Sequence, residues 1–387
     1  MIRNIAVGID IGSSTTKIVV GEFIKGEKNP KIIGVGESET KGMRHGYVIS
    51  SNETLSSLKS AIDIAEKNSK IKIKRAIISI SGVTLRGDIT SSNVVISKAD
   101  GEVTVLDINK AIDECENNVG LGNKKILQVF PVAFKLDSKE VLGNPEGMHG
   151  NKLEVKSLVI TCLNKHFEDL LEVITDAGIT PVDIIVAPIA ASSIALSKKQ
   201  KIVGSLLVNI GAETTSMVVY ENGEPISLHT FSIGSSDVTN DIALGFKINL
   251  EEAENLKLGN VDPSYSKKKL DEIIEARFGD IFELIENHLR KIKRSELLPA
   301  GVIFIGGGAN TLRIEEMSKS FLKLPSKVGT TDIFGNIKTK LRDPSWFTVL
   351  GLLYHNKESE IYSDSSFSNV FKDIKNAIKQ GIKQLKP

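Results

Sequence analysis

A strand–turn–strand pattern that occurs twice constrains the fold of this chain more than any other feature of its sequence. Apolar, β-forming residues flank a short polar turn containing glycine at 7–20, and the same arrangement recurs at 206–219. The two copies align without a gap, pairing Ile11 with Ile210, Gly12 with Gly211, Thr15 with Thr214 and Thr16 with Thr215. Because one copy opens each half of the chain, the repeat predicts two related lobes.

Each turn has the composition of a phosphate-binding site. Small residues between two strands direct several backbone N–H groups and hydroxyls at one point, which forms an anion-binding nest. Two such turns facing each other would hold a polyphosphate from both sides, in a cleft between the lobes. The candidate phosphate-binding residues are Gly12, Ser13, Ser14 and Thr15 in the first turn, and Gly211, Ala212, Glu213, Thr214 and Thr215 in the second.

A third glycine-rich segment lies near the end of the second half. Residues 302–310 have the pattern of a short buried strand that ends in three glycines, and a helical pattern follows at 314–322. Glycine lets the backbone approach a flat ligand, such as an adenine ring, without a Cβ in the way. Three glycines alone would also suit an ordinary strand-to-helix turn. The candidate residues are Gly307, Gly308, Ala309 and Asn310.

Composition disfavours several other classes of protein. A chain of 387 residues exceeds one compact core, and its net charge of +1 gives no general attraction to nucleic acid. Two cysteines without a CxxC pattern and six histidines without an HxxH or HxxxH pair fit inert thiols in a reduced compartment and no protein-borne metal site. We expect no signal peptide, no membrane-spanning segment and neither P-loop nor Rossmann chemistry.

Several motifs together resemble a known superfamily. DIGSSTTK at 10–17, NIGAETTS at 209–216 and the strand ending in GGG are similar to the two phosphate motifs and the adenosine motif of actin, sugar kinases and heat-shock chaperones. Within this superfamily the chain most resembles the FtsA family of bacterial cell-division proteins, over nearly its whole length. The motifs that carry this closer resemblance are KGMRHGYVI at 41–49, NPEGMHGNKLE at 144–154, DVTNDIA at 237–243 and EAENLK at 252–257.

The resemblance implies an α/β fold made of duplicated actin-like domains of the ribonuclease-H type, with a nucleotide cleft between them. It also implies an FtsA-type inserted subdomain that contacts other copies and other division proteins. The expected segments are 1–83 and 161–200 for the first domain, 84–160 for the inserted subdomain, 201–240 and 300–354 for the second domain, 241–299 for a helical subdomain, 355–366 for a linker and 367–387 for a C-terminal amphipathic helix.

The resemblance assigns further roles at the nucleotide. Asp10 would hold Mg²⁺ through water, and a carboxylate is the type of ligand that such a hard cation prefers. Lys17 occupies the position at which this superfamily brings a cation to the β-phosphate. Glu254 and Lys257, one turn apart on a helix, would bind the ribose and the adenine edge of ATP, although their spacing alone favours a surface ion pair.

Two departures from the superfamily pattern concern hydrolysis. The second phosphate turn carries Asn209 where hydrolysing relatives usually carry aspartate. As a candidate for cofactor binding, this amide can bind a magnesium-bound water but cannot accept its proton. Ala187 precedes Pro188 where many relatives place glutamate or glutamine. Because phosphoryl transfer depends on positioning of the attacking group, we expect ATP to bind and to turn over slowly or not at all.

The helical segment 241–299 is the region where FtsA-like proteins dock the C-terminal tail of their tubulin-like partner, FtsZ. It contains a mostly apolar stripe at 273–289 and a basic end at 290–294. Arg277, Lys291 and Arg294 are the candidate contacts for an acidic peptide. The alternative for each is a solvated basic side chain that favours the helix dipole.

The last segment has the pattern of a helix that lies in the plane of a membrane. At about 100° per residue, its large apolar side chains fall on one arc and its lysines on the opposite side. A terminal helix packed on the core is the alternative, which the polar linker and the lysine-rich face disfavour. The candidate membrane-binding residues are Phe367, Val370, Phe371, Ile374, Ile378, Ile382 and Leu385, with Lys375, Lys379 and Lys383.

The function implied by the resemblance is that of a cell-division adaptor. It would bind ATP and Mg²⁺, assemble with itself into filaments, and tether FtsZ filaments to the cytoplasmic face of the membrane at the division site, where other division proteins join. Two alternatives share the fold. A sugar kinase or other ATPase would need a carboxylate base that neither Asn209 nor Ala187 supplies, and a pilus-assembly relative lacks an amphipathic tail.

Overall fold

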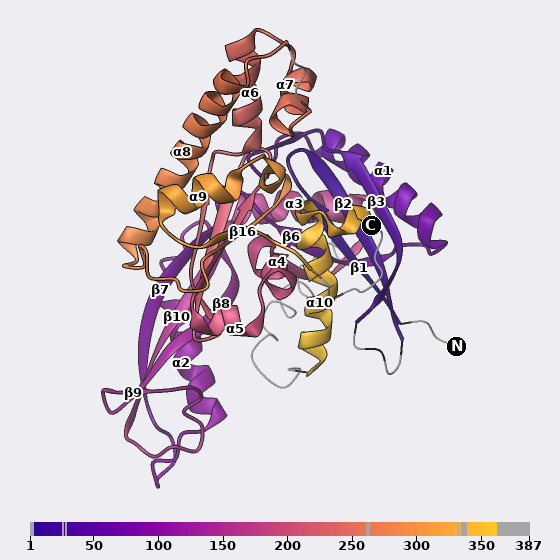
Figure 1. Cartoon of the computed structure of the whole chain (residues 1–387). Coiled ribbons are helices and arrows are strands. Elements are labelled where there is room, and N and C mark those ends of the chain that lie inside the picture. The colour runs from indigo at the N-terminus through magenta and orange to yellow at the C-terminus, as the bar shows by residue number, and fades with distance from the viewer. Residues whose placement is uncertain are drawn as a thin grey trace.

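The protein folds into two lobes joined through a pair of helices, with one extension at the top and another at the bottom of Figure 1. The computed structural model describes residues 4–24, 27, 29–260, 264–331, 333 and 339–361, with side chains described as far as Tyr354.

The first lobe is built on a five-stranded sheet in the order β11-β6-β1-β2-β3. β1, β2 and β3 form an antiparallel meander, while β6 pairs with β1, and β11 with β6, in parallel. The strands are β1 (Asn4–Ile11), β2 (Thr15–Phe23), β3 (Lys31–Glu39), β6 (Arg75–Ile80) and β11 (Thr180–Val186), with a separate hairpin of β4 (Met43–Arg44) and β5 (Tyr47–Val48). The helices are α1 (Ser51–Ser69), α3 (Asn164–Asp176), α4 (Ala187–Ala195) and α5 (Lys198–Val203).

The second lobe repeats this plan. Its strand order β16-β15-β12-β13-β14 has the same antiparallel meander and the same two parallel additions. The elements are β12 (Ser205–Ile210), β13 (Thr215–Glu221), β14 (Glu224–Phe231), β15 (Val302–Ile305) and β16 (Ser326–Val328), with α9 (Ile314–Leu322), α10 (Phe347–Ile361) and three 3₁₀ turns, η1 (Gly307–Asn310), η2 (Thr339–Arg342) and η3 (Pro344–Trp346). The duplicated architecture predicted from the repeat is confirmed.

The central hairpins form where aliphatic and β-branched residues run without a break. Both hairpins are buried on both faces, so consecutive positions must be apolar. Equivalent residues of the two hairpins are completely buried: Ile18, Val19 and Val20 in β2, and Met217, Val218 and Val219 in β13. Each run stops at a polar turn, which therefore lies at the edge of the apolar core.

The lobes meet on α4 and α10, one helix from each half of the chain. α10 packs on β1, β2 and β6, and α4 contacts strands of both sheets. A Cβ on Gly351 would lie 2.0 Å from the Ala190 carbonyl oxygen, so the two helix backbones touch where only glycine fits. α10 continues to Ile361, so the first part of the predicted linker 355–366 is helical instead. The predicted amphipathic helix 367–387 lies outside the described residues.

An inserted α/β unit leaves the first lobe between β6 and α3. It consists of β7 (Arg86–Val95), α2 (Val105–Asn117), β8 (Lys124–Leu136), β9 (Lys139–Val141) and β10 (Lys152–Leu163). β7 pairs with β14 at one position, Arg86 opposite His229, which extends the second sheet to nine strands. Thr104 and Asp107 cap the start of α2 through reciprocal hydrogen bonds.

Three helices stand at the top of Figure 1: α6 (Ser235–Phe246), α7 (Leu250–Lys257) and α8 (Lys267–Lys291). α6 begins at Ser235, so the predicted boundary of the helical subdomain at 240/241 falls inside a helix. The apolar stripe at 273–289 faces inward, and most of it packs into the core of the second lobe; its buried members are Ile274, Phe278, Ile281, Phe282, Ile285 and Leu289. These side chains are therefore unavailable to a partner.

Two further expectations concern the cysteines and the membrane. Cys115 and Cys162 are both buried and unoxidised, and burial raises the pKa of the Cys162 thiol to about 12, as expected for an inert thiol. Within the part of the chain that the structure describes, no helix is both long enough and apolar enough to cross a bilayer.

Candidate nucleotide site

The first turn, between β1 and β2, is held by one backbone hydrogen bond. The Gly12 N–H donates to the Thr15 carbonyl at 3.1 Å, and a Cβ on Gly12 would lie 3.0 Å from the same oxygen. Asp10 lies just before the turn, where the Ser79 hydroxyl of β6 donates to its carboxylate. The four turn residues are half-buried or exposed, so their polar groups are accessible at the end of a buried strand.

The second turn, between β12 and β13, has the same geometry. The Gly211 N–H donates to the Thr214 carbonyl at 2.8 Å. The N–H groups of Ser235 and Ser236, which open α6, donate to the carbonyls of Gly211 and Ala212, each at 2.8 Å. The helical subdomain therefore starts directly on the second turn. The repeat extends to the backbone hydrogen bonding of the two turns.

A hairpin to which the sequence motifs assigned no role joins the two turns. The Gly46 N–H donates to Ser13 Oγ at 3.1 Å. The His45 backbone N–H donates to the Glu213 carboxylate, and its ring Nδ1 lies 3.1 Å from the Glu213 carbonyl oxygen. One dipeptide of the first lobe thus contacts both turns and places them close together.

The sequence contains a signal for the conformation of this hairpin. His45 and Gly46 have φ values of +48° and +83° between β4 and β5. A two-residue hairpin turn of type I′ requires a positive φ at both central residues, which favours glycine at the second. The pair His-Gly between two short strands at 43–48 therefore marks the turn, although only the structure shows what it contacts.

The glycine-rich segment packs behind the second turn. Gly306 has a φ of +85°, and a Cβ on it would lie 2.3 Å from Asn209 Oδ1 and 2.4 Å from the Ile210 carbonyl oxygen. A Cβ on Gly308 would lie 2.3 Å from Ile210 Cγ2. Both positions therefore require glycine because the neighbouring strand is too close for a side chain.

The four residues predicted to face adenine differ in exposure. Gly307 and Asn310 are exposed, and the Asn310 amide donates to the Asp343 carboxylate at 3.0 Å. Gly308 and Ala309 are buried, so they support the segment from behind. Gly307 and Asn310 are the two that a ligand can reach.

Asp10 and Lys17 lie opposite each other on β1 and β2. Burial raises the pKa of Asp10, while the Ser79 hydrogen bond and the charge of Lys17 oppose the increase. Burial lowers the pKa of Lys17, against the charge of Asp10. The Lys17 ammonium donates to the Ser345 carbonyl at 3.2 Å and lies 5.4 Å from the centroid of the Trp346 ring. Both charges are poorly solvated, and a magnesium–phosphate group would bring each an opposite charge.

Glu254 and Lys257 form an ion pair of 2.6 Å that lies only partly at the surface, because the Glu254 side chain is 45% exposed while Lys257 is buried. Lys257 is 2% exposed, and its ammonium donates to the Ser235 carbonyl at 3.2 Å and the Thr239 hydroxyl at 2.9 Å. Burial lowers the pKa of Lys257, while Glu254 opposes this decrease. Because the Ser235 N–H donates to the Gly211 carbonyl of the second turn, the pair is anchored beside the phosphate-binding candidates. Its contact with a nucleotide stays a prediction.

The donor groups fit a nucleotide that brings its own metal ion. Among the residues that the structure describes, no cluster of three or more histidine, cysteine or acidic side chains could hold a metal. Asp10 and Asn209 occupy equivalent strand ends beside the two turns, and Mg²⁺ accepts carboxylate and amide oxygens while keeping several waters. These residues would complete the coordination of a magnesium ion already held by phosphates.

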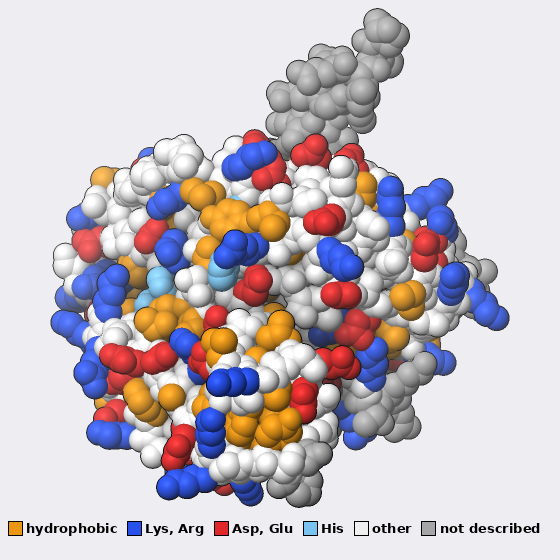
Figure 2. Space-filling view, turned by 90° about the horizontal axis from the view of Figure 1, so that it is seen from above, with side chains coloured by type: hydrophobic (Ala, Val, Ile, Leu, Met, Phe, Trp, Pro, Cys, Tyr) orange, Lys and Arg blue, Asp and Glu red, His pale blue; other side chains and the backbone are white. Residues whose placement is uncertain are grey.

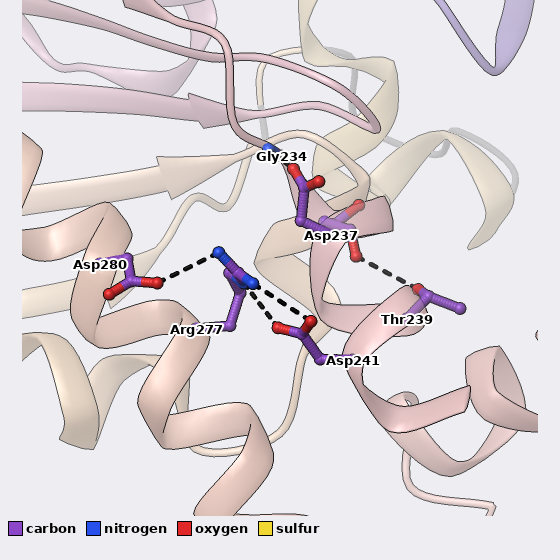
Figure 3. Close-up of polar contacts among 7 residues, drawn as sticks. Gly234, Asp237, Thr239, Asp241, Arg277 and Asp280 are labelled. Atoms are coloured by element: carbon purple, nitrogen blue, oxygen red, sulfur yellow. Dashed lines mark hydrogen bonds and ion pairs between the residues drawn. The ribbon is translucent and has the colours of Figure 1, made fainter. Parts of the chain in front are cut away.

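The first arginine predicted to bind a partner is already paired within the chain. Arg277 donates from two nitrogens to the Asp241 carboxylate, at 2.6 and 3.1 Å, and from a third to Asp280 at 3.1 Å (Figure 3). Asp237, in the same view, accepts from the Gly234 N–H and so caps the start of α6. Two carboxylates surround one guanidinium, which leaves no excess positive charge for an acidic peptide.

The other two candidates lie at the far end of α8. Arg294 makes a two-pronged ion pair with Glu221 of β13, which ties the end of the helical subdomain to the second sheet. Lys291 is exposed. Of the three predicted contacts, Lys291 alone combines a positive charge with an exposed position.

An open hollow of about 550 Å³ lies over α6 and the start of α7. Leu244, 77% exposed, and Leu250 contribute apolar walls. Lys247 lies in the lining and Lys267 and Lys268 are exposed where α8 begins. Figure 2, seen from this end of the molecule, shows hydrophobic side chains gathered among both basic and acidic side chains. The residues that line this α6 groove are Asn240, Ala243, Leu244, Lys247, Ile248 and Leu250.

Similar solved structures define the class of protein. The chain superposes on a chain of the PilM–PilN type IV pilus biogenesis complex with a TM-score of 0.68 at 17% identity, covering 90% of this chain and 98% of that one. It superposes on MreB 5 of Spiroplasma citri bound to AMPPNP with a TM-score of 0.54 at 14% identity, covering 98% and 99%. With the duplicated lobes and the paired turns, these likenesses define an actin-like fold.

Closer relatives define the family. The cell division protein FtsA of Bacillus subtilis strain 168 is 30% identical over 369 residues, 90% of this chain and 82% of that protein. FtsA of Pseudomonas aeruginosa is 26% identical over 376 residues, 92% and 89%. Residues 206–351 match the family model described as cell division protein FtsA, and residues 82–161 match the SHS2 domain inserted in FtsA. The chain belongs to the FtsA family, which confirms the resemblance.

Proposed function

We propose that this chain is a cell-division adaptor that binds ATP with Mg²⁺, assembles with itself, and links FtsZ filaments to the cytoplasmic face of the membrane at the division site. It would also recruit other division proteins there. Membership of the FtsA family supports the division role. The observation that carries nucleotide binding is the contact of His45 and Gly46 with Ser13 and Glu213, which brings two phosphate-binding turns together.

Slow or absent hydrolysis is part of this proposal. Asn209 presents an amide beside the second turn, and Ala187, the first residue of α4, has no polar side chain. A sugar kinase or a fast ATPase is therefore less well supported, since both need a group that takes a proton or orients the nucleophile. A pilus-assembly role shares only the fold with the PilM–PilN chain, at 17% identity.

Membrane attachment is proposed for residues 367–387. Each lysine close to an anionic leaflet contributes about 1 kcal/mol, and the apolar arc adds the burial of its side chains. One tail of this kind binds reversibly. Tails arrayed on a filament bind together with much higher avidity, so self-assembly would strengthen attachment.

Co-sedimentation of the full chain with anionic vesicles tests the attachment. Phe371→Glu with Ile378→Glu should abolish most of the binding, because two charges enter the apolar face. Ile49→Glu with Ile64→Glu adds the same charge on exposed positions of the first lobe and should leave binding unchanged. Equal sedimentation of the tail variant and the unmodified chain would overturn the membrane proposal.

The FtsZ tail is proposed to dock in the α6 groove. An acidic, partly apolar peptide would find apolar walls at Leu244 and Leu250 and positive charge at Lys247, Lys267 and Lys268. Arg277 and Arg294 are less suitable, because internal carboxylates already neutralise them. The groove therefore replaces the arginines as the proposed contact.

Fluorescence anisotropy with a labelled peptide of the FtsZ C-terminal tail tests this docking. Leu244→Glu should weaken binding about tenfold or more, since a buried apolar contact is lost and like charges meet. Leu106→Glu is the matched control, an exposed leucine on the inserted unit. Unchanged affinity of Leu244→Glu would exclude the groove.

A further inference from the structure

The hairpin that joins the two phosphate turns has a support of its own. Its contact with the first turn is the Gly46 N–H, which donates to Ser13. Its contact with the second turn is His45, whose N–H donates to the Glu213 carboxylate. Both bonds use backbone N–H groups, so they depend on where the hairpin backbone lies. Whatever fixes that backbone therefore also fixes the two turns relative to each other.

The hairpin packs on the segment that leads into the inserted unit. The Val83 N–H donates to the His45 carbonyl at 3.2 Å. A Cβ on Gly46 would lie 2.4 Å from the Cα of Gly82, so the two backbones touch where a side chain does not fit. Gly82 and Val83 lie between β6 and β7, the first strand of the inserted unit. One connection of the chain to the inserted unit therefore lies directly against the hairpin.

The other connection contributes His166, near the start of α3, which follows the last strand of the inserted unit. His166 is 2% exposed, and its Nδ1 lies 2.7 Å from the hydroxyl oxygen of Thr84. Its ring centroid lies 4.8 Å from that of Tyr47 in the hairpin. Residues 81–85 and 164–166, which this imidazole joins, are called the root of the inserted unit below.

The imidazole of His166 uses both of its nitrogens. Burial lowers its pKa, while a hydrogen bond to the Gly46 backbone and the charge of Asp169 oppose the decrease. Because this hydrogen bond favours the protonated ring, its partner is the Gly46 carbonyl, to which a ring N–H donates. The second nitrogen of a neutral imidazole is an acceptor, so Nδ1 accepts from the Thr84 hydroxyl. The ring thus bridges the root and the hairpin.

We propose that His166 is a positioning residue for nucleotide binding, which holds the His45–Gly46 hairpin where both phosphate turns can bind one polyphosphate. The proposal rests on the nucleotide binding proposed above. His166 acts through the hairpin, which in turn contacts Ser13 and Glu213. Because His166 belongs to the root, the inserted unit and the phosphate turns share one support.

Isothermal titration of the full chain with magnesium–ATP tests this role. His166→Phe keeps a ring beside Tyr47 but removes both nitrogens, so the affinity should fall about tenfold. His288→Phe is the matched control, because that ring also has a hydroxyl partner, Ser227 at 2.8 Å, and also stacks on a neighbouring ring, but it lies on α8. The control should bind as the unmodified chain does. Unchanged affinity in His166→Phe, or an equal loss in both variants, would overturn the proposal.

Conservative substitutions separate positioning from stability. Glutamine places its amide close to the position of Nε2 of histidine, and asparagine places its amide close to that of Nδ1. His166→Gln should therefore keep the bond to Gly46 and most of the affinity. His166→Asn should keep only the bond to Thr84 and lose affinity as His166→Phe does. Chemical denaturation gives the free energy of unfolding of each variant. Affinities that follow this free energy, and not the contact with Gly46, would contradict the positioning role.

The hydroxyl of Thr84 orients the ring, so Thr84→Val should weaken magnesium–ATP binding in the same direction. Combined with His166→Phe it should add little, because the two residues act through one contact. Fully additive losses would contradict the route from the root through His166 to the hairpin.

Hydrogen exchange tests the same support without nucleotide. Amides in peptides that cover residues 43–48 should exchange about tenfold faster in His166→Phe than in the unmodified chain, because the hairpin opens more often. His288→Phe should leave this exchange unchanged. Equal exchange in His166→Phe and the unmodified chain would overturn the proposal. If the unmodified chain does not bind magnesium–ATP but His166→Phe still speeds exchange, nucleotide binding is refuted and the support of the hairpin by His166 is retained.

Discussion

The two phosphate turns have the same backbone but different side chains beside them. In both, the N–H of the glycine donates to the carbonyl three residues later, at 3.1 and 2.8 Å. The threonine after each turn is buried and bonded to the segment after the third strand, Thr16 to Thr40 and Thr215 to the Ile233 carbonyl. Duplication has therefore preserved the geometry that aims a turn at a ligand.

The chemistry at the strand ends is not duplicated. Asp10 has Ser79 beside it on the neighbouring strand, and the hydroxyl donates to its carboxylate. Asn209, the equivalent residue, pairs with Ile305 and packs against Gly306. One turn thus carries a charged oxygen with a polar neighbour, and the other carries a neutral amide in a tighter, more apolar setting. Asp10, beside the first turn, suits a metal-bound water. Asn209, beside the second turn, can help to hold a ligand but cannot act as a base.

The largest effect, a loss of stability, is expected at Gly306, which packs behind the second turn. Gly306 has φ +85° and ψ 173°, a region essentially restricted to glycine, and Gly306→Ala would place Cβ against Asn209. We expect the free energy of unfolding to fall by about 2–4 kcal/mol. Chemical denaturation measures it. Gly307→Ala, with no atom within 4 Å of the added Cβ, should change it little, and equal losses in both would contradict the packing argument.

Asp10→Asn makes the first turn resemble the second. Affinity for magnesium–ATP should fall about 10- to 100-fold, because a hydrogen bond to a charged group contributes about 1.5–3 kcal/mol. Isothermal titration with and without Mg²⁺ measures the change. ATP without Mg²⁺ should bind the two proteins much more equally. A similar loss in both conditions would show that Asp10 does not act through the cation.

Asn209→Asp makes the second turn resemble the first. The unmodified chain should hydrolyse ATP more slowly than about 1 per second, and the aspartate should raise the rate about tenfold or more because it can accept a proton. Phosphate release measures the rate, with Asn209→Ala as the control that removes the amide without adding a base. No increase would assign the low rate to Ala187 instead.

The smallest effect concerns pH. The Ser79 hydrogen bond lowers the pKa of Asp10, so Ser79→Ala should raise that pKa beyond what burial already does. A protonated Asp10 cannot assist Mg²⁺, so affinity for magnesium–ATP falls as pH decreases, and in Ser79→Ala this loss begins at a higher pH. Titrations across mildly acidic pH measure the difference, which should be a few-fold. Asp10→Asn has no carboxylate at this position, so it measures the part of the pH dependence that comes from the ionisation of ATP itself.

Much of the site was visible in the sequence because its parts are local. Gly12 to Thr15 and Gly211 to Thr214 are short turns whose shape depends on residues a few positions apart. The strand Val302–Ile305 and the helix Ile314–Leu322 also fall where the pattern predicts them. The exposure of the candidates was not visible: Ala309 is buried, and Arg277 is neutralised by Asp241 and Asp280.

The sequence by itself determined that two similar halves would each present a small polar turn, because periodicity and turn composition are properties of neighbouring residues. Only the tertiary structure decided what those turns meet. His45 reaches Glu213 across 168 positions, and Lys257 is buried against Ser235 beside the second turn. Such contacts depend on how the lobes and helices pack in three dimensions, and the spacing of residues along the chain does not predict them.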